Sequence, residues 1–371
     1  MKIVAIDSFI ARLKLGTPLK MAGTLITHSE NLFVKITSDK GHIGWGESAS
    51  APNMTGEIPA GMLGAVRFLS RILLNQEFTS AQGLLSKMDQ PLLGNYSAKS
   101  AIETAFLDAQ ARDQDIPVHQ LLGKQRREKI AALIMVAGGG TQNDAQVAAN
   151  DYAAGWRSFK VKVGMDTPAN DAARTISVLQ AVGKDAMVCA DANRGYTFAQ
   201  SLEYVELIKG HGLHFFEQPM ASDQDHEWKE LSTQSSTPIG IDETLKNVHV
   251  LNHFMDHQLA QGGSFKAIKF GGLNRVVEAG IVADAKNFKI NLACKVAETS
   301  IASAAALHIA AVLPNLDWGI SLTHEYLDME YASQPLRFIN GLATIPTGPG
   351  LGIEVNESAL RAMAVHEKDL F

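Results

Sequence analysis

The chain has 371 residues, of which 46% are hydrophobic and 19% charged, a composition typical of a globular protein with one large core or two domains. Its net charge of -6 gives no reason to expect a nucleic-acid partner or an anionic membrane surface. Charged residues interrupt the N-terminal segment, and no run of about 18 apolar residues is present to span a bilayer. We therefore expect neither a signal peptide nor a membrane anchor.

Residues 1–125 have the pattern of an α+β domain. The segment NLFVKITSDKGHIGWGE contains two alternating apolar and polar runs around Asp39-Lys40-Gly41, which is typical of a β-hairpin. Further along, AKSAIETAFLDAQARDQ carries an apolar stripe that includes Ile102 and Phe106, and it predicts a helix that ends near Asp113. Strands followed by helices is the order of an α+β domain.

Residues 126–324 alternate short apolar strands with amphipathic segments. The strands start roughly 25 to 28 residues apart, and eight of them is the number that closes a parallel (β/α) barrel. The predicted strands are Ala132–Val136, Phe159–Val163, Met187–Ala190, His214–Glu217, Ile239–Asp242, Phe265–Ile268, Ile290–Cys294 and Trp318–Leu322.

The cysteines Cys189 and Cys294 both lie in apolar strand-like segments. Buried free thiols in a reducing, cytoplasmic compartment are the expected state of such residues.

The second barrel strand contains FKVKVG, in which Lys160 and Lys162 share one face. Because parallel strands flanked by helices are buried on both faces, we expect these lysines inside the barrel, near the C-terminal ends of the strands. Burying an ammonium group without a partner costs several kcal/mol, so the pair indicates a functional site.

Three successive strands end in carboxylates: Asp191 in VCADANRGY, Glu217 in HFFEQP and Asp242 in IGIDET. Each could simply cap the helix that follows its strand. Their recurrence at the spacing of one βα unit instead favours convergence on one point, where three hard oxygen ligands without Cys or His describe a Mg²⁺ site.

The sixth strand brings Lys266 and Lys269 in SFKAIKFGG. A closed barrel has no solvent-facing edge, so we expect one of the two to point inward, across the barrel from Lys162. A metal ion between two lysines suits removal of the weakly acidic proton α to a carboxylate, because the cation stabilises the enediolate that forms. A lysine that acts as the base must be neutral near pH 7, which a neighbouring ammonium group favours.

These motifs together resemble the enolase superfamily, in its muconate-lactonising subgroup. The resemblance rests on IGWGE, the Lys-x-Lys strand, DANRGY, EQP, DET and KAIKFGG, and it covers nearly the whole length. It implies one Mg²⁺ per subunit, a small carboxylate as substrate and a homo-oligomer. It also implies that the loops Pro18–Thr24 and Ser48–Thr55 of the first domain close over the substrate. By the same resemblance, residues 325–371 return to the first domain and complete this cap.

The resemblance implies a role for each residue of the motifs. Lys162 would be the base on one face of the substrate, Lys266 the acid or base on the other, and Lys160 would bind or polarise the substrate carboxylate. Asp191, Glu217 and Asp242 would bind the metal, with Asn193 and Glu243 supporting these ligands.

The resemblance indicates removal of an α-proton but does not indicate which overall reaction follows. The subgroup includes cycloisomerases, racemases, epimerases and dehydratases; we expect an isomerase, with a dehydratase as the alternative and a non-catalytic metal-binding barrel as a further one. Where muconate cycloisomerases usually place a Glu, this chain has Ser321, and the seventh strand continues as CKVAET, with Lys295 and Glu298. Lys295 either contacts a second anionic group of the substrate or lies along the barrel rim with its head in water.

Overall fold

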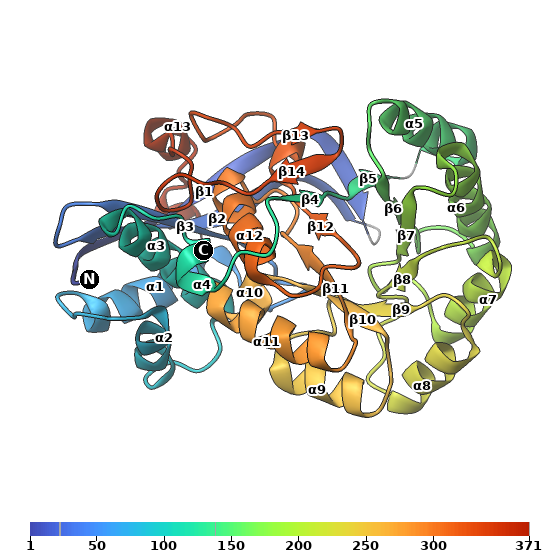
Figure 1. The fold of residues 1–371 in the computed structure, drawn as a ribbon, viewed down its shortest axis with the longest axis horizontal. Helices are drawn as coiled ribbons and strands as arrows, with labels where there is room; N and C mark the ends of the chain where they lie inside the picture. Colours follow the sequence, from blue (N-terminus) through green and yellow to red (C-terminus); the bar gives the residue numbers. More distant parts are fainter. Residues whose placement is uncertain (22–23, 138, 371) are drawn as a thin grey trace.

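The computed structural model describes residues 1–21, 24–137 and 139–370. Residues 22 and 23 of the expected loop Pro18–Thr24 therefore lie outside the described residues. An α+β domain built from the first third of the chain lies beside a barrel, and the C-terminal helix α13 (Glu357–Ala362) lies close to the first strands (Figure 1). Within the described part of the chain, no helix is both long and apolar enough to cross a membrane.

The N-terminal domain is an antiparallel sheet covered by helices. The predicted hairpin is confirmed: Thr37 pairs with Ile43 across the turn, where Gly41 has a φ of 87°. The strands are β1 (Ile3–Met21), β2 (Thr24–Ser38) and β3 (Ile43–Ala49), and the helices are α1 (Pro59–Leu73), α2 (Ala81–Asp89), α3 (Tyr96–Asp113) and α4 (His119–Leu122).

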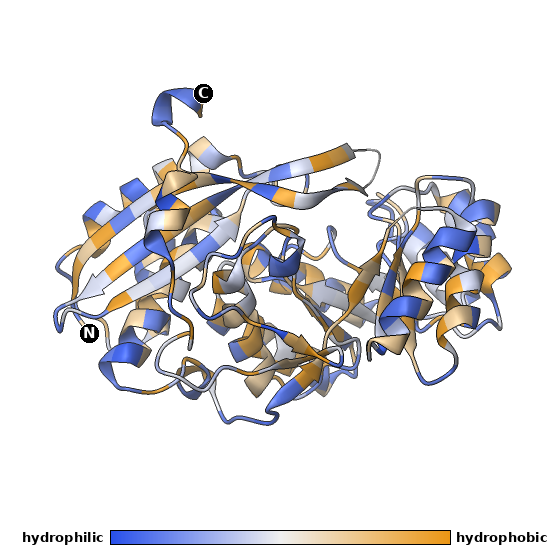
Figure 2. Ribbon diagram, turned by 90° about the horizontal axis from the view of Figure 1, so that it is seen from above, coloured by the Kyte–Doolittle hydropathy of each residue, from blue (hydrophilic) through white to orange (hydrophobic). Residues whose placement is uncertain are grey.

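Helix α3 ends at Asp113, as predicted, but it is buried on nearly all sides rather than along one stripe. The sheet approaches it closely because β3 presents glycines. A Cβ added to Gly46 would lie 1.9 Å from the carbonyl oxygen of Ala101. Beyond β3, the ribbon formed by β1 and β2 extends toward the barrel (Figure 2), so this domain can contribute residues to the barrel mouth.

The second domain is a near-closed parallel barrel. Its eight strands follow one another in chain order, and the amide of Leu133 donates to the carbonyl of Ile320 at 2.8 Å to join the first strand region to the last. The strands are β5 (Ile134–Val136), β6 (Ser158–Lys162), β7 (Met187–Asp191), β8 (Phe215–Glu217), β9 (Ile239–Ile241), β10 (Gly262–Phe265), β11 (Lys289–Ala293) and β12 (Ile320–Ser321).

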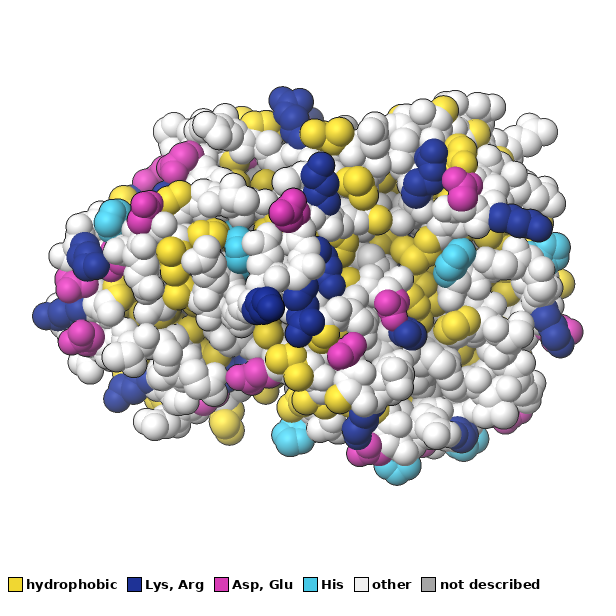
Figure 3. Space-filling view, in the orientation of Figure 1, with side chains coloured by type: hydrophobic (Ala, Val, Ile, Leu, Met, Phe, Trp, Pro, Cys, Tyr) yellow, Lys and Arg dark blue, Asp and Glu magenta, His cyan; other side chains and the backbone are white. Residues whose placement is uncertain are grey.

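Helices surround this barrel on its outer side (Figure 1). They are α5 (Thr141–Ala153), α6 (Pro168–Val182), α7 (Phe198–Ile208), α8 (Asp225–Gln234), α9 (Val248–Asp256), α10 (Ala267–Phe270), α11 (Leu273–Ala285) and α12 (Ser300–Val312). Acidic and basic side chains are interspersed on the face seen in Figure 3, with a group of lysines and arginines near its centre.

Side chains fill part of the barrel interior. The rings of Phe215 and Trp318 stack at 4.0 Å, and a Cβ on Gly262 would lie 2.4 Å from the indole. Cys189 packs in the same cluster, and both Cys189 and Cys294 are buried free thiols, as expected. The filled interior leaves the strand ends as the place for a site.

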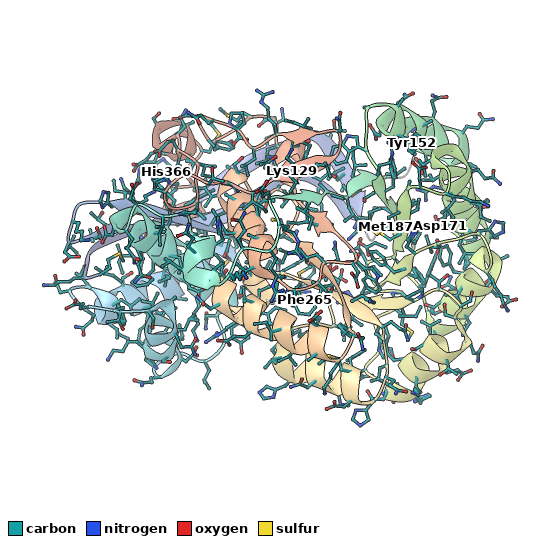
Figure 4. All side chains as sticks on the ribbon, in the orientation of Figure 1. Lys129, Tyr152, Asp171, Met187, Phe265 and His366 are labelled. Carbon is teal, nitrogen blue, oxygen red and sulfur yellow. The ribbon has the colours of Figure 1, made fainter. Side chains whose placement is uncertain are left out.

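The predicted sixth strand, Phe265–Ile268, is wrong in its position. Strand β10 ends at Phe265, which Figure 4 labels, and Lys266 begins the single turn α10. On a helical turn, residues three apart lie on the same side, whereas on a strand they point to opposite faces. The turn thus directs Lys266 and Lys269 to one carboxylate, Asp242.

The predicted first strand, Ala132–Val136, is also shorter than expected. The chain forms β4 (Lys129–Ala131), then β5. Strand β4 pairs with β14 (Leu342–Thr344), which also pairs with β13 (Phe338–Ile339), in a small antiparallel sheet. Two short 3₁₀ turns, His324–Tyr326 and Glu367–Asp369, complete the C-terminal segment. This segment contacts the first domain, where the amide of Arg12 donates to Met363 O at 3.0 Å.

Candidate active site

Strand β6 carries two lysines inside the barrel. All of its residues are buried, and it pairs in parallel with β5 and β7. Lys160 is 8% exposed and Lys162 5% exposed, so the face they share is the interior and not solvent. A buried ammonium group needs an anionic partner, and each of these lysines has one.

Three ion pairs converge at the C-terminal ends of the strands. Lys162 Nζ lies 2.6 Å from Asp191 Oδ2, and Lys160 Nζ lies 2.5 Å from Glu217 Oε2. These carboxylates end β7 and β8 and are paired directly across the two strands, so they lie at the same height.

The third pair joins Lys266 Nζ to Asp242 Oδ2 at 2.5 Å, just beyond the end of β9. Asp242 also has a second cationic partner, a contact that the sequence did not predict: Lys269 Nζ donates to its Oδ1 at 2.7 Å and to its carbonyl oxygen at 2.6 Å. Lys269 is 1% exposed. The expectation that one of these two lysines points inward was too narrow, because both reach the carboxylate. The sequence signal for this arrangement was the spacing of Lys266 and Lys269, which are three residues apart, as on one side of a helical turn, just before the glycine pair Gly271-Gly272.

Asn193 and Glu243 connect the ion pairs. Asn193 accepts a hydrogen bond from Lys162 Nζ at 2.8 Å and donates to Glu243 Oε1 at 3.1 Å. Its φ of 44° is a left-handed conformation that Asn tolerates better than most residues. Glu243 Oε2 is buried and has no hydrogen-bond partner among the described residues.

The barrel interior also contains two polar residues that the sequence analysis missed. Ser264 Oγ donates to Glu217 Oε1 at 2.6 Å and contacts Asn291 Oδ1 at 3.0 Å. Asn291 Nδ2 donates to the carbonyl of Trp318 at 3.1 Å. A buried Asn within the apolar strand KINLA was a signal for an interior polar group, since such groups are found hydrogen-bonded.

Burial and ion pairing compete in setting the charges of the site. Burial disfavours the charged form of Asp242, but Lys266 and Lys269 outweigh it and hold the pKa of this carboxyl well below its usual range. Burial likewise disfavours the ammonium of Lys266, yet Asp242 raises the net pKa of that lysine above its ordinary value. The pKa of Lys160 is raised for the same reason, with Glu217 outweighing burial. The carboxylates thus favour the charged forms of Lys160 and Lys266.

The pKa of Glu243 is raised to about 7, first by burial and then by the neighbouring charges of Asp242 and Asp191. A carboxyl group with a raised pKa and an unpartnered buried oxygen is a group for which a cation would provide a partner.

All three ion pairs line one cavity of about 130 Å³ at the barrel mouth. The N-terminal domain contributes Ile26 from the β1–β2 hairpin and Asn53 and Met54 from the expected loop Ser48–Thr55. The remaining lining residues come from the barrel and from the segment after it: Leu133, Met135, Asn193, Glu243, Ala293, Cys294, Lys295, Val296, Ser321, Leu322, Thr323 and Tyr326, besides the three lysines and three carboxylates of the ion pairs.

Glu298 lies beside this cavity and supports it. Its Oε2 accepts from the amide of Lys295 at 2.8 Å, and its Oε1 accepts from the amide of Ala49 in β3 at 3.1 Å. Glu298 therefore ties the end of β11 to the N-terminal domain instead of lining the 130 Å³ cavity itself. Ser321, in contrast, lines the cavity, with its Oγ 3.4 Å from Asn291 Oδ1.

The donor set fits a divalent cation in its chemistry. Within residues 1–21, 24–137 and 139–370, no three His, Cys, Asp or Glu side chains are arranged as a metal centre, and each of the three carboxylates is bonded to a lysine. They are nevertheless hard oxygen donors on adjacent strands around one cavity, next to the unpartnered oxygen of Glu243. A cation would have to compete with the lysines for these oxygens.

Comparison with known proteins places the chain in a family. The model of the mandelate racemase/muconate lactonizing enzyme N-terminal domain matches residues 5–123, and the model of the enolase C-terminal domain-like region matches residues 144–359. The chain belongs to the mandelate racemase/muconate lactonizing enzyme family of the enolase superfamily. The resemblance inferred from the motifs is thereby confirmed, and enzymes of this family typically use a divalent metal ion.

Related proteins share the architecture over almost the whole chain. Muconate cycloisomerase 1 of Rhodococcus opacus is 29% identical, covering 97% of this chain and 98% of its own, and N-succinyl-L-Arg/Lys racemase of Bacillus cereus is 26% identical, covering 99% of both. The crystal structure of the muconate lactonizing enzyme of Pseudomonas fluorescens, complexed with muconolactone, superimposes with a TM-score of 0.93 at 25% identity, covering 98% of this chain and 99% of that one.

Proposed function

We propose that this protein is a Mg²⁺-dependent isomerase (a racemase, epimerase or cycloisomerase) that removes the α-proton of a small carboxylate. The observation that carries the proposal is the placement of Lys162 and Lys266 on opposite sides of one cavity. Lys162 is the last residue of β6, and Lys266 is the first residue after β10. These two strands are four positions apart in the ring of eight, and both lysines line the cavity.

Two lysine side chains on opposite sides of a substrate carbon suit two proton transfers, in which one accepts a proton as the neutral amine and the other donates a proton as the ammonium. Lys162 takes the α-proton from one face, and Asp191 and Asn193 hold its Nζ in place at 2.6 and 2.8 Å. Lys266 returns a proton to the other face, and its raised pKa is consistent with an acid that starts protonated. Lys160 binds the substrate carboxylate and so keeps the α-carbon between the other two lysines.

Asp191, Glu217 and Asp242 would hold the Mg²⁺, which when bound stabilises the negative charge that develops on the substrate carboxylate. Asn193 and Glu243 orient these ligands through the hydrogen bond between them. The relatives support an isomerase as the class of enzyme, since one is named a cycloisomerase and another a racemase.

Proton NMR in D₂O tests the proposal. The protein would be incubated with Mg²⁺ and a panel of N-acylamino acids, dipeptides, amino-acid betaines, muconates and hydroxy acids. We expect deuterium to enter the α-position of at least one acid. Loss of optical activity would identify a racemase or epimerase, and a new lactone signal a cycloisomerase. An alkene formed with loss of water would replace the isomerase by a dehydratase, and no exchange with any acid would contradict the proposal.

A variant of the second lysine tests the two-sided arrangement. For a racemised substrate, Lys266→Ala should retain α-proton exchange from one enantiomer and lose it from the other. Equal exchange from both enantiomers would contradict the role of Lys266.

A further inference from the structure

Lys295 is a fourth lysine in the wall of the cavity, and its backbone is held on both sides. It follows the end of β11, its amide donates to Glu298 Oε2 at 2.8 Å, and its carbonyl accepts from Thr323 Oγ1 at 2.7 Å. A side chain on such an anchored segment lines the cavity from a defined position.

The ammonium group of Lys295 differs from the other three in the cavity. Lys160, Lys162 and Lys266 each have a carboxylate within 2.6 Å. Among the described residues, Lys295 Nζ forms no hydrogen bond and no ion pair; the contacts of Lys295 are made by its backbone. Burial, followed by the charge of Lys266, lowers its pKa to about 8. The charges of Glu298 and Asp242 act on Lys295 only partly against this effect. A partly buried cation without a directly bonded anion is unfavourable, and an anionic ligand group would remove that cost.

Lys295 lies far around the barrel from Asp191 and Glu217, two of the predicted metal ligands. Strand β11 lies four positions from β7, so Lys295 is across the ring of eight strands from Asp191. A substrate carboxylate bound near the ends of β7 and β8 would therefore not be the same group as the substrate anion that contacts Lys295. The cavity wall also contains neutral apolar residues that suit the carbon chain between two such groups: Ile26, Met54, Leu133, Met135, Val296 and Leu322.

We infer that Lys295 is a specificity-determining residue that binds a second anionic group, at the end of the substrate distal to the reacting carboxylate. This inference rests on the proposed function, and it makes the substrate a dianion. The sequence left two alternatives for Lys295: contact with a second anionic group of the substrate, or an ammonium group exposed to water at the barrel rim. The inference is the first of these.

Binding of diacids tests this role without catalysis. The probes are the dicarboxylates from succinate to adipate and the monomethyl ester of each, which has nearly the same shape but one charge less. Calorimetric titration in Mg²⁺ should show at least one diacid binding about tenfold or more tightly than its ester, as a charge-assisted hydrogen bond allows. Lys295→Met should remove that preference by weakening the diacid alone, and Lys295→Arg should retain it.

The control is Lys246→Met, which removes an exposed lysine outside the cavity and should leave the preference unchanged. Thermal unfolding of each variant shows whether it is folded. No diacid preferred over its ester by the unaltered protein, or a preference that survives in folded Lys295→Met, would overturn the inference. Exchange of an α-proton without a diacid preference would refute the role of Lys295 alone, whereas a preference for diacids without exchange of any acid would refute the proposed function alone.

Discussion

Replacing Lys160 by Met should destabilise the protein strongly, because it leaves a buried carboxylate without its cation. The ammonium of Lys160 lies 2.5 Å from Glu217, and the two side chains are 10% and 2% exposed. Removing one member of a buried ion pair typically costs about 3–5 kcal/mol. Ser264 remains bonded to the other carboxylate oxygen, but a hydroxyl supplies no counter-charge.

Equilibrium urea unfolding in EDTA measures this loss. The matched control is Lys209→Met, which breaks an ion pair of 3.1 Å with Glu206 whose side chains are 54% and 72% exposed. Solvent screens such a pair, so the control should lose no more than about 1 kcal/mol. A loss for Lys160→Met as small as that of the control would refute the idea that Glu217 is charged and buried.

Magnesium adds a second result to the same experiment. If Glu217 is a metal ligand, saturating Mg²⁺ should reduce the difference between Lys160→Met and the unaltered protein, because the cation then supplies the missing positive charge. A difference that is the same in EDTA and in Mg²⁺ would contradict the assignment of Glu217 as a ligand.

Three further changes have defined outcomes. Asp242→Asn should weaken Mg²⁺ binding and lower activity together, and calorimetry showing unchanged affinity would remove this residue from the ligand set. Gly46→Ala should lower the melting temperature sharply because its Cβ would meet the backbone of α3, whereas Gly64→Ala, in an open position within α1, should raise stability by about 0.5–1 kcal/mol; equal effects would contradict the close packing. Burial lowers the pKa of His308 to about 3, so the unfolded chain takes up this proton first and stability falls as the pH drops below about 6.5. His308→Gln should flatten that slope between pH 6.5 and 5 by up to about 1.4 kcal/mol per pH unit, and an unchanged slope in urea unfolding would show that His308 is not buried in its neutral form.

The positions of the three carboxylates were predictable because a parallel barrel repeats. Once strands and helices alternate at a regular spacing, the ends of the strands lie at one mouth, and residues that follow them meet there. The interior direction of Lys160 and Lys162 follows from the alternation of side chains along a strand that is covered on both faces.

Other features depend on contacts that no local pattern reveals. The turn α10 forms around Asp242, a residue of another strand, so an apolar-looking segment with two lysines resembled a strand when read alone. The small sheet of β4, β13 and β14 joins segments some two hundred residues apart. Ser264 and Asn291 become part of the site only because Ser264 reaches Glu217 across the barrel interior and Asn291 contacts Ser264.

The charge state of the lysines was the least predictable property. The spacing of Lys160 and Lys162 suggests mutual repulsion, but the closer carboxylates dominate at Lys160 and at Lys266. Charge–charge energies fall with distance. Whether the pKa of a lysine is raised or lowered therefore depends on whether a carboxylate or another lysine lies a few ångströms closer.

The role of Lys162 as the base is tested most directly by the rate of α-proton exchange in D₂O. This rate would be measured for the unaltered protein and for Lys162→Ala, with Mg²⁺ and an acid whose α-proton the unaltered protein exchanges. We expect the variant to remain folded and to lose exchange by about 10²–10⁴-fold, the contribution typical of a positioned general base. Exchange by the folded variant at the rate of the unaltered protein would contradict the role of Lys162 and, with it, the proposed mechanism.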